Sequence, residues 1–221
     1  MGWIMKYKTE PALTGVADGR SANINQADVI LYDVIADWVK ECSTVLDLGC
    51  GSGELLQKLI MLKKVRAQGI EIDENAIYSC VAKGLSVLHE DINGGLKDYS
   101  DKSFDYVILY NTFQEVKKPS EVLDEALRVG KNVIAGFPNF AYYRSRFQIF
   151  FKGKVPVTPS LPYQWFDTPN LHFLSIKDFE DYCRLKNITI HKKTFADAKR
   201  KKIVRFLPNF FAEQALYLIS R

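Results

Sequence analysis

Three glycines at alternate positions, Gly49, Gly51 and Gly53, follow an aspartate in the stretch VLDLGCGSGE (45–54). Glycines crowded at the end of a strand let the backbone turn tightly and approach a ligand closely. A dinucleotide-binding fingerprint would read GxGxxG, whereas this chain has Glu54 at the place of the last glycine, where a carboxylate would repel a phosphate. A phosphate-binding P-loop needs GK[ST] after its glycines, and none follows here. The ligand of this turn is therefore expected to be neither a dinucleotide nor a nucleoside triphosphate.

The pattern DxGxGxG, which begins at Asp47, resembles motif I of the class I S-adenosylmethionine-dependent methyltransferases. S-adenosylmethionine presents an ammonium group, a sulfonium, a ribose and an adenine, with no phosphate to hold. The resemblance implies that the turn 49–53, with Cys50 inside it, passes close to the methionine portion of S-adenosylmethionine or S-adenosylhomocysteine. Asp47 would orient the turn and favour the cationic end. Taken alone, the motif also fits a simple tight turn between a strand and a helix.

A carboxylate at the tip of the next expected strand should take the ribose hydroxyls, because it can accept two hydrogen bonds. Glu71 fills that place, and Asp73 is the second candidate. The family's usual carboxylate ends the strand, which favours Glu71.

Two further positions follow the order of cofactor contacts in these methyltransferases. Asp91, after the third expected strand, resembles the residue that receives the adenine amino group, with Ile72 or Ile92 against the ring. Asn111, just past the fourth expected strand, occupies the usual motif IV position near the transferring methyl. Each carboxylate alone fits a solvated surface residue, but their joint occurrence at successive strand ends favours a cofactor site.

Apolar runs predict the elements that must position these residues. Strands are expected at 45–48, 69–72, 85–89, 104–110, 132–137, 188–195 and 212–221, and helices at 26–40, 55–62, 76–81, from 119, and at 175–187. Strands separated by helices indicate βαβ units and a doubly wound sheet, in which ligands bind beyond the carboxyl ends of the strands. The predicted fold is α/β, with a mostly parallel seven-stranded sheet of the class I methyltransferase, Rossmann-like type.

Residues 139–172 interrupt this alternation with nine aromatic residues and four prolines. The segment is too apolar for a disordered linker. We expect a single domain over residues 1–221, with 139–172 as an ordered insertion whose aromatic side chains need burial and which covers the carboxyl edge of the sheet.

Composition excludes several other classes of protein. The net charge of +4 permits an acidic partner without requiring one. The four scattered cysteines suit reduced thiols in a cytoplasmic protein, and no metal site is expected. No apolar run reaches transmembrane length, so no membrane association is expected. The basic stretch KRKKIVR (199–205) would meet phosphates in a nucleic-acid-binding protein, but a charge run between two strands favours a solvated loop.

Longer segments resemble the methionine biosynthesis protein MetW family. They include VLDLGCGSGELL, GIEID, EVLDEALRVGKNVIAGFPNF and KGKVPVTPSLPYQWFDTPNLHFLSIKDFEDYC. The resemblance runs from about Ala27 to the C-terminus, and the proline-rich segment is not generic methyltransferase sequence. NTFQEV (111–116) departs from the family pattern, and residues 1–25 have no counterpart. The resemblance implies a role in methionine biosynthesis alongside homoserine O-acyltransferase.

Two functions remain open, and whether the protein is an enzyme is not decided. The chain is either a cofactor-binding partner of homoserine O-acyltransferase, which we favour, or an independent S-adenosylmethionine-dependent methyltransferase acting on a small molecule. A partner predicts an exposed apolar patch on the insertion, since aromatics are enriched in interface cores. An independent enzyme predicts an enclosed cavity. No catalytic residue is assigned, and the candidate residues of an acceptor pocket are Asn111, Gln114, Tyr142, Tyr163, Trp165 and His172.

Overall fold

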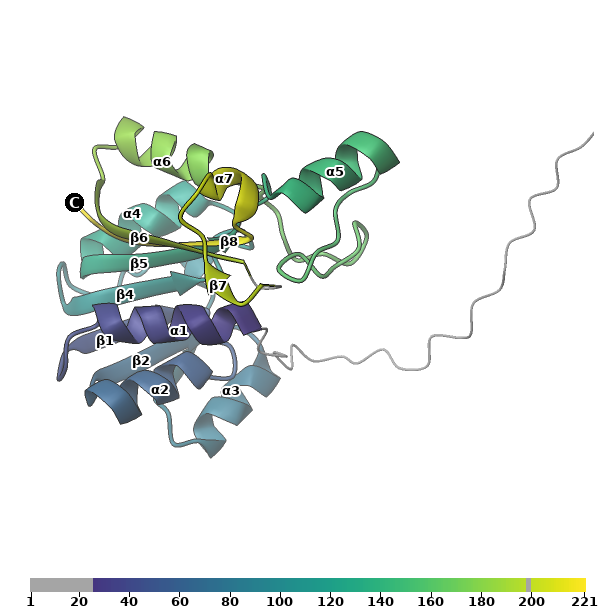
Figure 1. The fold of residues 1–221 in the computed structure, drawn as a ribbon. Coiled ribbons are helices and arrows are strands. Elements are labelled where there is room, and N and C mark those ends of the chain that lie inside the picture. The colour runs from purple at the N-terminus through teal and green to yellow at the C-terminus, as the bar shows by residue number, and fades with distance from the viewer. Residues whose placement is uncertain (1–25, 198–199) are drawn as a thin grey trace, which may run out of the picture.

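The computed structural model describes residues 26–197 and 200–221, which form one mixed sheet with helices on both faces (Figure 1). The strands are β1 (Thr44–Leu48), β2 (Arg66–Glu71), β3 (Val87–His89), β4 (Phe104–Tyr110), β5 (Gly130–Pro138), β6 (Thr189–Asp197), β7 (Lys202–Ile203) and β8 (Gln214–Ser220). The helices are α1 (Gln26–Trp38), α2 (Glu54–Lys63), α3 (Glu74–Ala82), the 3-10 turn η1 (Ile92–Gly94), α4 (Pro119–Val129), α5 (Tyr143–Lys152), α6 (Ile176–Leu185) and α7 (Pro208–Phe211).

The sheet has the strand order β3-β2-β1-β4-β5-β8-β6-β7. Strands β1 to β5 pair in parallel, while β8 pairs antiparallel with both β5 and β6. The chain proceeds from β1 outward to β3 and then returns to the other side of β1 with β4, so the switch point lies between β1 and β4. The predicted α/β class and doubly wound sheet are confirmed.

The sheet has eight strands rather than the predicted seven. The extra strand is β7, which has two residues and pairs antiparallel with the end of β6. It lies in the basic stretch that the sequence predicts as a solvated loop. A two-residue edge strand carries no readable alternation of apolar and polar residues, so its sequence gives no strand signal.

Two apolar layers enclose the sheet. Helices α1 and α2 pack on one face, where Leu31, Ile35 and Leu59 are fully buried. Helices α4 and α6 pack on the other face through Leu123 and Phe179. The central strands are buried on both faces, which explains why they read as continuous apolar runs. Within the described ranges, no helix is both long and apolar enough to cross a membrane.

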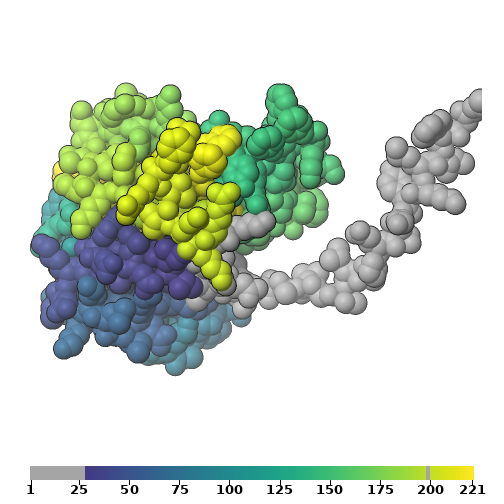
Figure 2. Space-filling model, in the orientation of Figure 1, coloured from purple at the N-terminus to yellow at the C-terminus, as the bar shows by residue number. Residues whose placement is uncertain are grey.

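The insertion leaves and rejoins the sheet at a closed base, where Phe140 N donates to Leu174 O over 3.1 Å. It contains α5, which the proline-rich sequence does not predict, and α5 ends at Gly153 with φ +58°. The Gln148 side chain both donates to Val157 O (3.0 Å) and accepts from Val157 N (3.1 Å), which joins α5 to the returning chain. Figure 1 places α5 beyond the carboxyl end of β4, and Figure 2 shows the insertion as a lobe that protrudes from the body. We call residues 141–173 the aromatic lobe.

The aromatic lobe buries only some of its aromatic side chains. Tyr142 is buried at its base, whereas Phe150 is 81% exposed and Trp165 is 72% exposed. Phe151 and Phe166 are exposed as well. The expectation that the aromatic density of this segment is buried within the chain is therefore wrong for its outer residues.

Candidate functional site

The glycine turn joins β1 to α2 with all three glycines in the left-handed region, at φ +76°, +54° and +81°. A Cβ at Gly49 would lie 2.6 Å from Thr112 Oγ1, and a Cβ at Gly53 would lie 2.4 Å from Leu85 Cδ1. Gly51 has nothing within 4 Å of the corresponding position. Close packing therefore explains Gly49 and Gly53, whereas the backbone of Gly51 faces open space that a ligand can occupy.

Glu71 ends β2, as predicted, and ties that strand to the glycine turn. Its Oε2 accepts a hydrogen bond from Gly51 N over 2.8 Å, and its Oε1 accepts from Ile72 N and Asp73 N over 2.8 and 3.0 Å. The side chain is buried, yet a carboxylate has about four acceptor positions, so capacity for a ligand hydroxyl remains. Asp73, the second candidate for the ribose, instead caps α3 by accepting from Ala76 N over 2.8 Å.

Asp47 lies inside β1 and is only 3% exposed. Burial, and after it the neighbouring Glu71 carboxylate, raises the pKa of Asp47 to about 7. Both effects disfavour the charged carboxylate, and a cation nearby would favour it. The turn therefore has two acidic groups beneath it and suits a positively charged ligand better than an anion.

The residues predicted for the adenine end follow β2 and β3, with Ile72 after β2 and Asp91 and Ile92 after β3. Asp91 Oδ1 accepts from Asn93 N and Asn93 Nδ2 over 2.9 and 2.7 Å, which starts the turn η1. Ile72 is half exposed, and Ile92 packs partly against the core. Glu90 N donates to Glu71 O over 3.2 Å, so the chain after β3 stays next to the tip of β2.

Asn111 follows β4 with φ +56°, and its backbone N donates to Gly136 O. Its side-chain Nδ2 donates to Asp28 Oδ1 over 3.3 Å, and Tyr110 Oη donates to the same oxygen over 2.6 Å. Gln214 Nε2 also approaches Asp28 Oδ1, at 3.4 Å. Asn111 is thus positioned by a buried polar cluster at the carboxyl end of β4.

The Asp28 cluster is not predicted from the sequence. Asp28 shares one helical face with Leu31 and Ile35, and an acidic residue on an apolar helix face is a usable signal for a buried polar partner. The neighbouring Tyr32 ring meets Tyr110 edge-on at 5.4 Å between centroids. Burial, and then Asp28 and Asp47, raises the pKa of Tyr32 above its usual range. Asp28 and Asp47 therefore both act on Tyr32.

The loop after β4 also contacts the end of the aromatic lobe. Leu171 N and His172 N both donate to Gln114 O, over 2.9 and 3.1 Å, and Gln114 Nε2 donates to Asn111 O over 2.8 Å. Gln114 and His172, both predicted as acceptor-pocket candidates, are therefore joined at the carboxyl edge of the sheet. Tyr163 and Trp165, from the same set, are exposed on the lobe.

The cysteines near the turn are structural. Cys50 Sγ and Cys80 Sγ both lie near Gly51 O, at 3.7 and 3.2 Å, and burial raises the pKa of both thiols. A raised pKa lowers the thiolate fraction and so the reactivity of the thiol. In the part of the chain that the structure describes, no group of three or more His, Cys, Asp or Glu side chains has a metal-binding arrangement.

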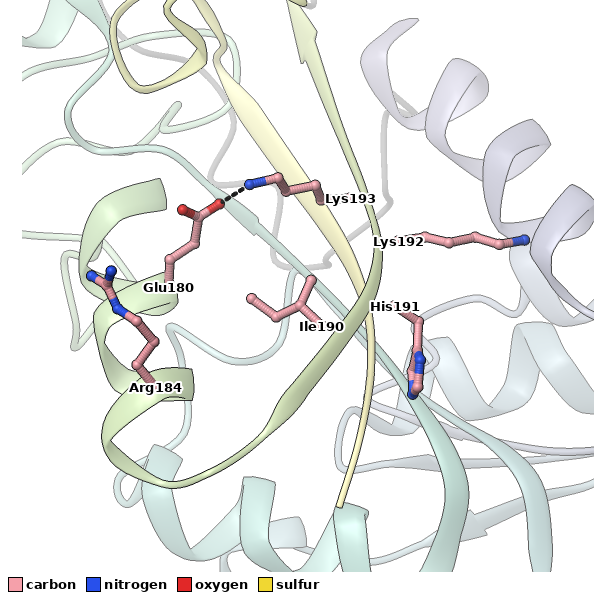
Figure 3. A pocket seen from close by; sticks show the side chains of 6 residues that line it. All are labelled: Glu180, Arg184, Ile190, His191, Lys192 and Lys193. Carbon is pink, nitrogen blue, oxygen red and sulfur yellow. Dashed lines mark hydrogen bonds and ion pairs between the residues drawn. The ribbon is translucent and has the colours of Figure 1, made fainter.

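A separate depression of about 300 Å³ lies between α6 and β6 (Figure 3). Glu180 and Arg184 of α6 line it together with Ile190, His191 and two lysines of β6. The Glu180 carboxylate is paired there with Lys193 at 2.9 Å. None of the predicted cofactor residues lines this depression, so it is distinct from the glycine-turn site.

Solved structures with this fold include S-adenosylmethionine-dependent methyltransferases. One from Archaeoglobus fulgidus has a TM-score of 0.65 and 16% identity, covering 87% of this chain and 94% of that chain. Another from Thermotoga maritima has a TM-score of 0.61 and 19% identity, covering 86% and 87%. The chain therefore has the Rossmann-like fold of this class of methyltransferases, and likeness at these identities concerns the fold alone.

The sequence comparisons identify a more specific family than the fold does. The methionine biosynthesis protein MetW family matches residues 30–219. The bifunctional methionine biosynthesis protein MetXA/MetW of Rhodopirellula baltica is 34% identical over 190 residues, which is 81% of this chain and 30% of that protein. The chain belongs to the MetW family, as the sequence resemblance predicts. It spans about 30% of the length of this relative.

Proposed function

We propose that the protein binds S-adenosylmethionine at the glycine turn and acts in methionine biosynthesis as a partner of homoserine O-acyltransferase. The observation that carries the partner role is the exposed aromatic surface of the lobe, which stands beside the cofactor edge. The cofactor role rests on the glycine turn and the acidic groups beneath it.

The residues of the turn fit S-adenosylmethionine. Open space in front of Gly51 admits the methionine portion, and the buried Asp47 and Glu71 carboxylates favour its cationic end. Glu71 holds the Gly51 amide and has acceptor capacity left for the ribose. When bound, S-adenosylmethionine supplies an activated methyl group on a sulfonium. The contributions of the chain are to bind the cofactor, to orient it through Gly51 and Asn111, and to favour its positive charge.

The exposed aromatic rings of the lobe form two groups. Phe147 stacks on Phe151 at 5.4 Å between centroids, Phe150 meets Phe151 at 4.8 Å, and Trp165 meets Phe166 at 5.8 Å. Burying one such side chain is worth about 1.5–3 kcal/mol. Large exposed apolar patches on a folded protein mark interaction sites, and aromatic residues are enriched in interface cores. The lobe therefore has the chemistry of a protein-binding surface.

A separate groove is lined mainly by α6 and α7, with one residue of the lobe. It has a volume of about 610 Å³, and Arg146, Ile176, Leu207 and Phe210 are among its lining residues. The Arg146 guanidinium lies 5.5 Å from the centroid of Phe210. The lining of the groove also includes Lys177, Glu180, Asp181, Arg184 and Lys193, so this groove is more charged than the exposed rings of the lobe.

The relative from Rhodopirellula baltica supports the identity of the partner, since its name joins MetXA and MetW in one polypeptide. Linking two proteins covalently raises their effective concentration for each other. A fusion of this kind is an advantage for two proteins that must bind each other to function. We infer that this chain contacts its acyltransferase partner through the lobe.

Size-exclusion chromatography and calorimetry with homoserine O-acyltransferase from the same organism test this proposal. We expect co-elution at micromolar concentrations and a change in acyltransferase activity. Trp165→Ala should weaken association by about 2 kcal/mol, the loss typical of an interface anchor. Tyr78→Ala is the matched control, because Tyr78 is 69% exposed on α3, outside the lobe. Both variants should keep their affinity for S-adenosylhomocysteine.

The partner role is wrong if the two proteins elute separately and acyltransferase activity is indifferent to this protein with or without S-adenosylmethionine. The alternative is then an independent methyltransferase acting on a small molecule. One specific observation favours it, namely that the buried side-chain atoms Gln114 Oε1 and His172 Nε2 have no hydrogen-bond partner among the described residues.

A further inference from the structure

Two buried polar atoms at the carboxyl edge have no hydrogen-bond partner among the described residues. They are Gln114 Oε1 and His172 Nε2. Gln114 is only 4% exposed, and an unpaired buried acceptor costs about 1–3 kcal/mol. Native proteins usually satisfy such atoms, so each one needs a physical explanation.

The orientation of the Gln114 amide follows from its neighbours. Its Nε2 donates to Asn111 O over 2.8 Å, and a reversed amide would set two acceptors against each other. Oε1 is therefore the end that points away from Asn111 and needs a donor. Within the lobe, His172 is held next to Gln114 because its backbone N donates to Gln114 O over 3.1 Å.

Both residues lie next to Asn111, at the carboxyl end of β4. Gln114 is three residues past Asn111, and the same loop packs on the glycine turn where Thr112 meets Gly49. The cluster of Asp28 with Tyr110 fixes the other side of Asn111. The loop after β4, the lobe and the glycine turn thus converge on one place.

We propose that Gln114 Oε1 and His172 Nε2 form a subsite for the primary amino group of a small methyl acceptor, an inference that rests on the proposed cofactor site. With the His172 ring proton on Nδ1, both atoms are acceptors and suit a group with at least two N–H donors, and the acidic Asp28 nearby favours an amine over an anion. In methyl transfer, one amine proton passes to His172 Nε2 while the other N–H is held by Gln114 Oε1. The nitrogen lone pair forms the N–C bond, the C–S bond breaks, and its electron pair remains on sulfur.

Sinefungin is the probe for this subsite, because an amino-bearing carbon replaces the sulfonium and its methyl group. S-adenosylhomocysteine is the reference ligand, since it shares every other contact and lacks that amine. Calorimetry should find sinefungin bound about tenfold more tightly than S-adenosylhomocysteine by the wild-type protein, as expected for a hydrogen bond involving a charged group.

His172→Phe keeps the ring and removes Nε2, and Gln114→Met removes Oε1. Each should bring the ratio of the two affinities close to one while the affinity for S-adenosylhomocysteine changes by less than about twofold. His191→Phe is the matched control and should keep the wild-type ratio, because His191 is exposed and its Nε2 lies 2.8 Å from Ser220 Oγ on the far part of the sheet. Circular dichroism checks that each variant is folded.

The possible results separate the two proposals. If S-adenosylhomocysteine does not bind the wild-type protein, the cofactor site is wrong and the subsite with it. If it binds but sinefungin has no advantage, the two atoms hold water only and the subsite is overturned alone. A sinefungin preference that survives both variants also overturns it, because the buried carboxylates then produce the preference. If one of the two variants is unfolded, the affinity ratio of the other variant tests the subsite.

Discussion

Replacing Asp47 by asparagine should stabilise the ligand-free protein, and more so at pH 8 than at pH 5. The side chain is 3% exposed inside β1, and burial together with Glu71 raises the pKa of Asp47 from 3.8 to about 7. Asparagine has nearly the same shape and carries no charge at either pH. The change therefore removes the ionisation of this residue with little change in packing.

The sign and size of this pH-dependent stabilisation follow from proton linkage. Between pH 3.8 and pH 7 the folded state holds a proton on Asp47 that the unfolded state has released, so the stability contributed by this residue falls as the pH rises. A shift of one pKa unit is worth about 1.4 kcal/mol. The full shift, reached above pH 7, therefore costs about 4 kcal/mol, whereas at pH 5 the cost is about 2 kcal/mol. The stabilisation by Asp47→Asn should be about 2 kcal/mol larger at pH 8.

Urea unfolding of the wild-type protein and the variant at both pH values measures this difference. The comparison requires equal m-values, because a changed slope would mean a changed denatured state. Asp37→Asn is the control, since Asp37 is exposed on α1 and its variant should follow the wild-type pH dependence. A variant less stable than the wild type at both pH values, or a gain that does not change with pH, would refute the reasoning.

Three further outcomes are expected. The affinity for S-adenosylmethionine, measured by calorimetry, should rise between pH 6 and pH 8 as Asp47 ionises. In the Asp47→Asn variant the affinity should change little over this pH range. An equal rise in the variant would contradict the role of Asp47. Gly51→Ala should weaken cofactor binding in calorimetry and leave the melting temperature nearly unchanged. Gly53→Ala should instead destabilise the fold by about 1–3 kcal/mol, because its Cβ would lie 2.4 Å from Leu85 at φ +81°. Equal losses of stability in the two variants would be evidence against an open Gly51. Ser175→Ala should cost about 1 kcal/mol in urea unfolding, because Ser175 forms a capping box with Asp178 at the start of α6, and an unchanged midpoint would argue against that cap.

The local sequence predicts the central fold and much of the candidate site. The strand FDYVILY is found at Phe104–Tyr110, as predicted, because a run buried on both faces is apolar throughout. Pro119 marks the start of α4 because proline fits the first turn of a helix. The glycine turn follows β1 at the switch point and Glu71 ends the neighbouring strand β2, because the carboxyl ends of parallel strands meet at one edge of the sheet. These features depend on residues close together in the chain, where periodicity and turn chemistry can be read directly.

Other features of the site depend on contacts between distant residues. Asp28 meets Tyr110 across 82 positions of the chain, and Leu171 and His172 meet Gln114 across more than fifty. No local sequence pattern predicts these contacts, because they form only when the helices and the insertion pack against the sheet. The position of β8 between β5 and β6 is of the same kind.

By itself, the amino-acid sequence determined the α/β alternation, the glycine turn with its acidic neighbours, and the MetW family. Only the tertiary structure decided that the outer rings of the aromatic lobe stay exposed, that α5 forms within it, and that Gln114 and His172 share one edge with Asn111. The physical reason is that propensity and periodicity act over a few residues. Exposure and side-chain pairing depend instead on which surfaces are left after the whole chain has packed.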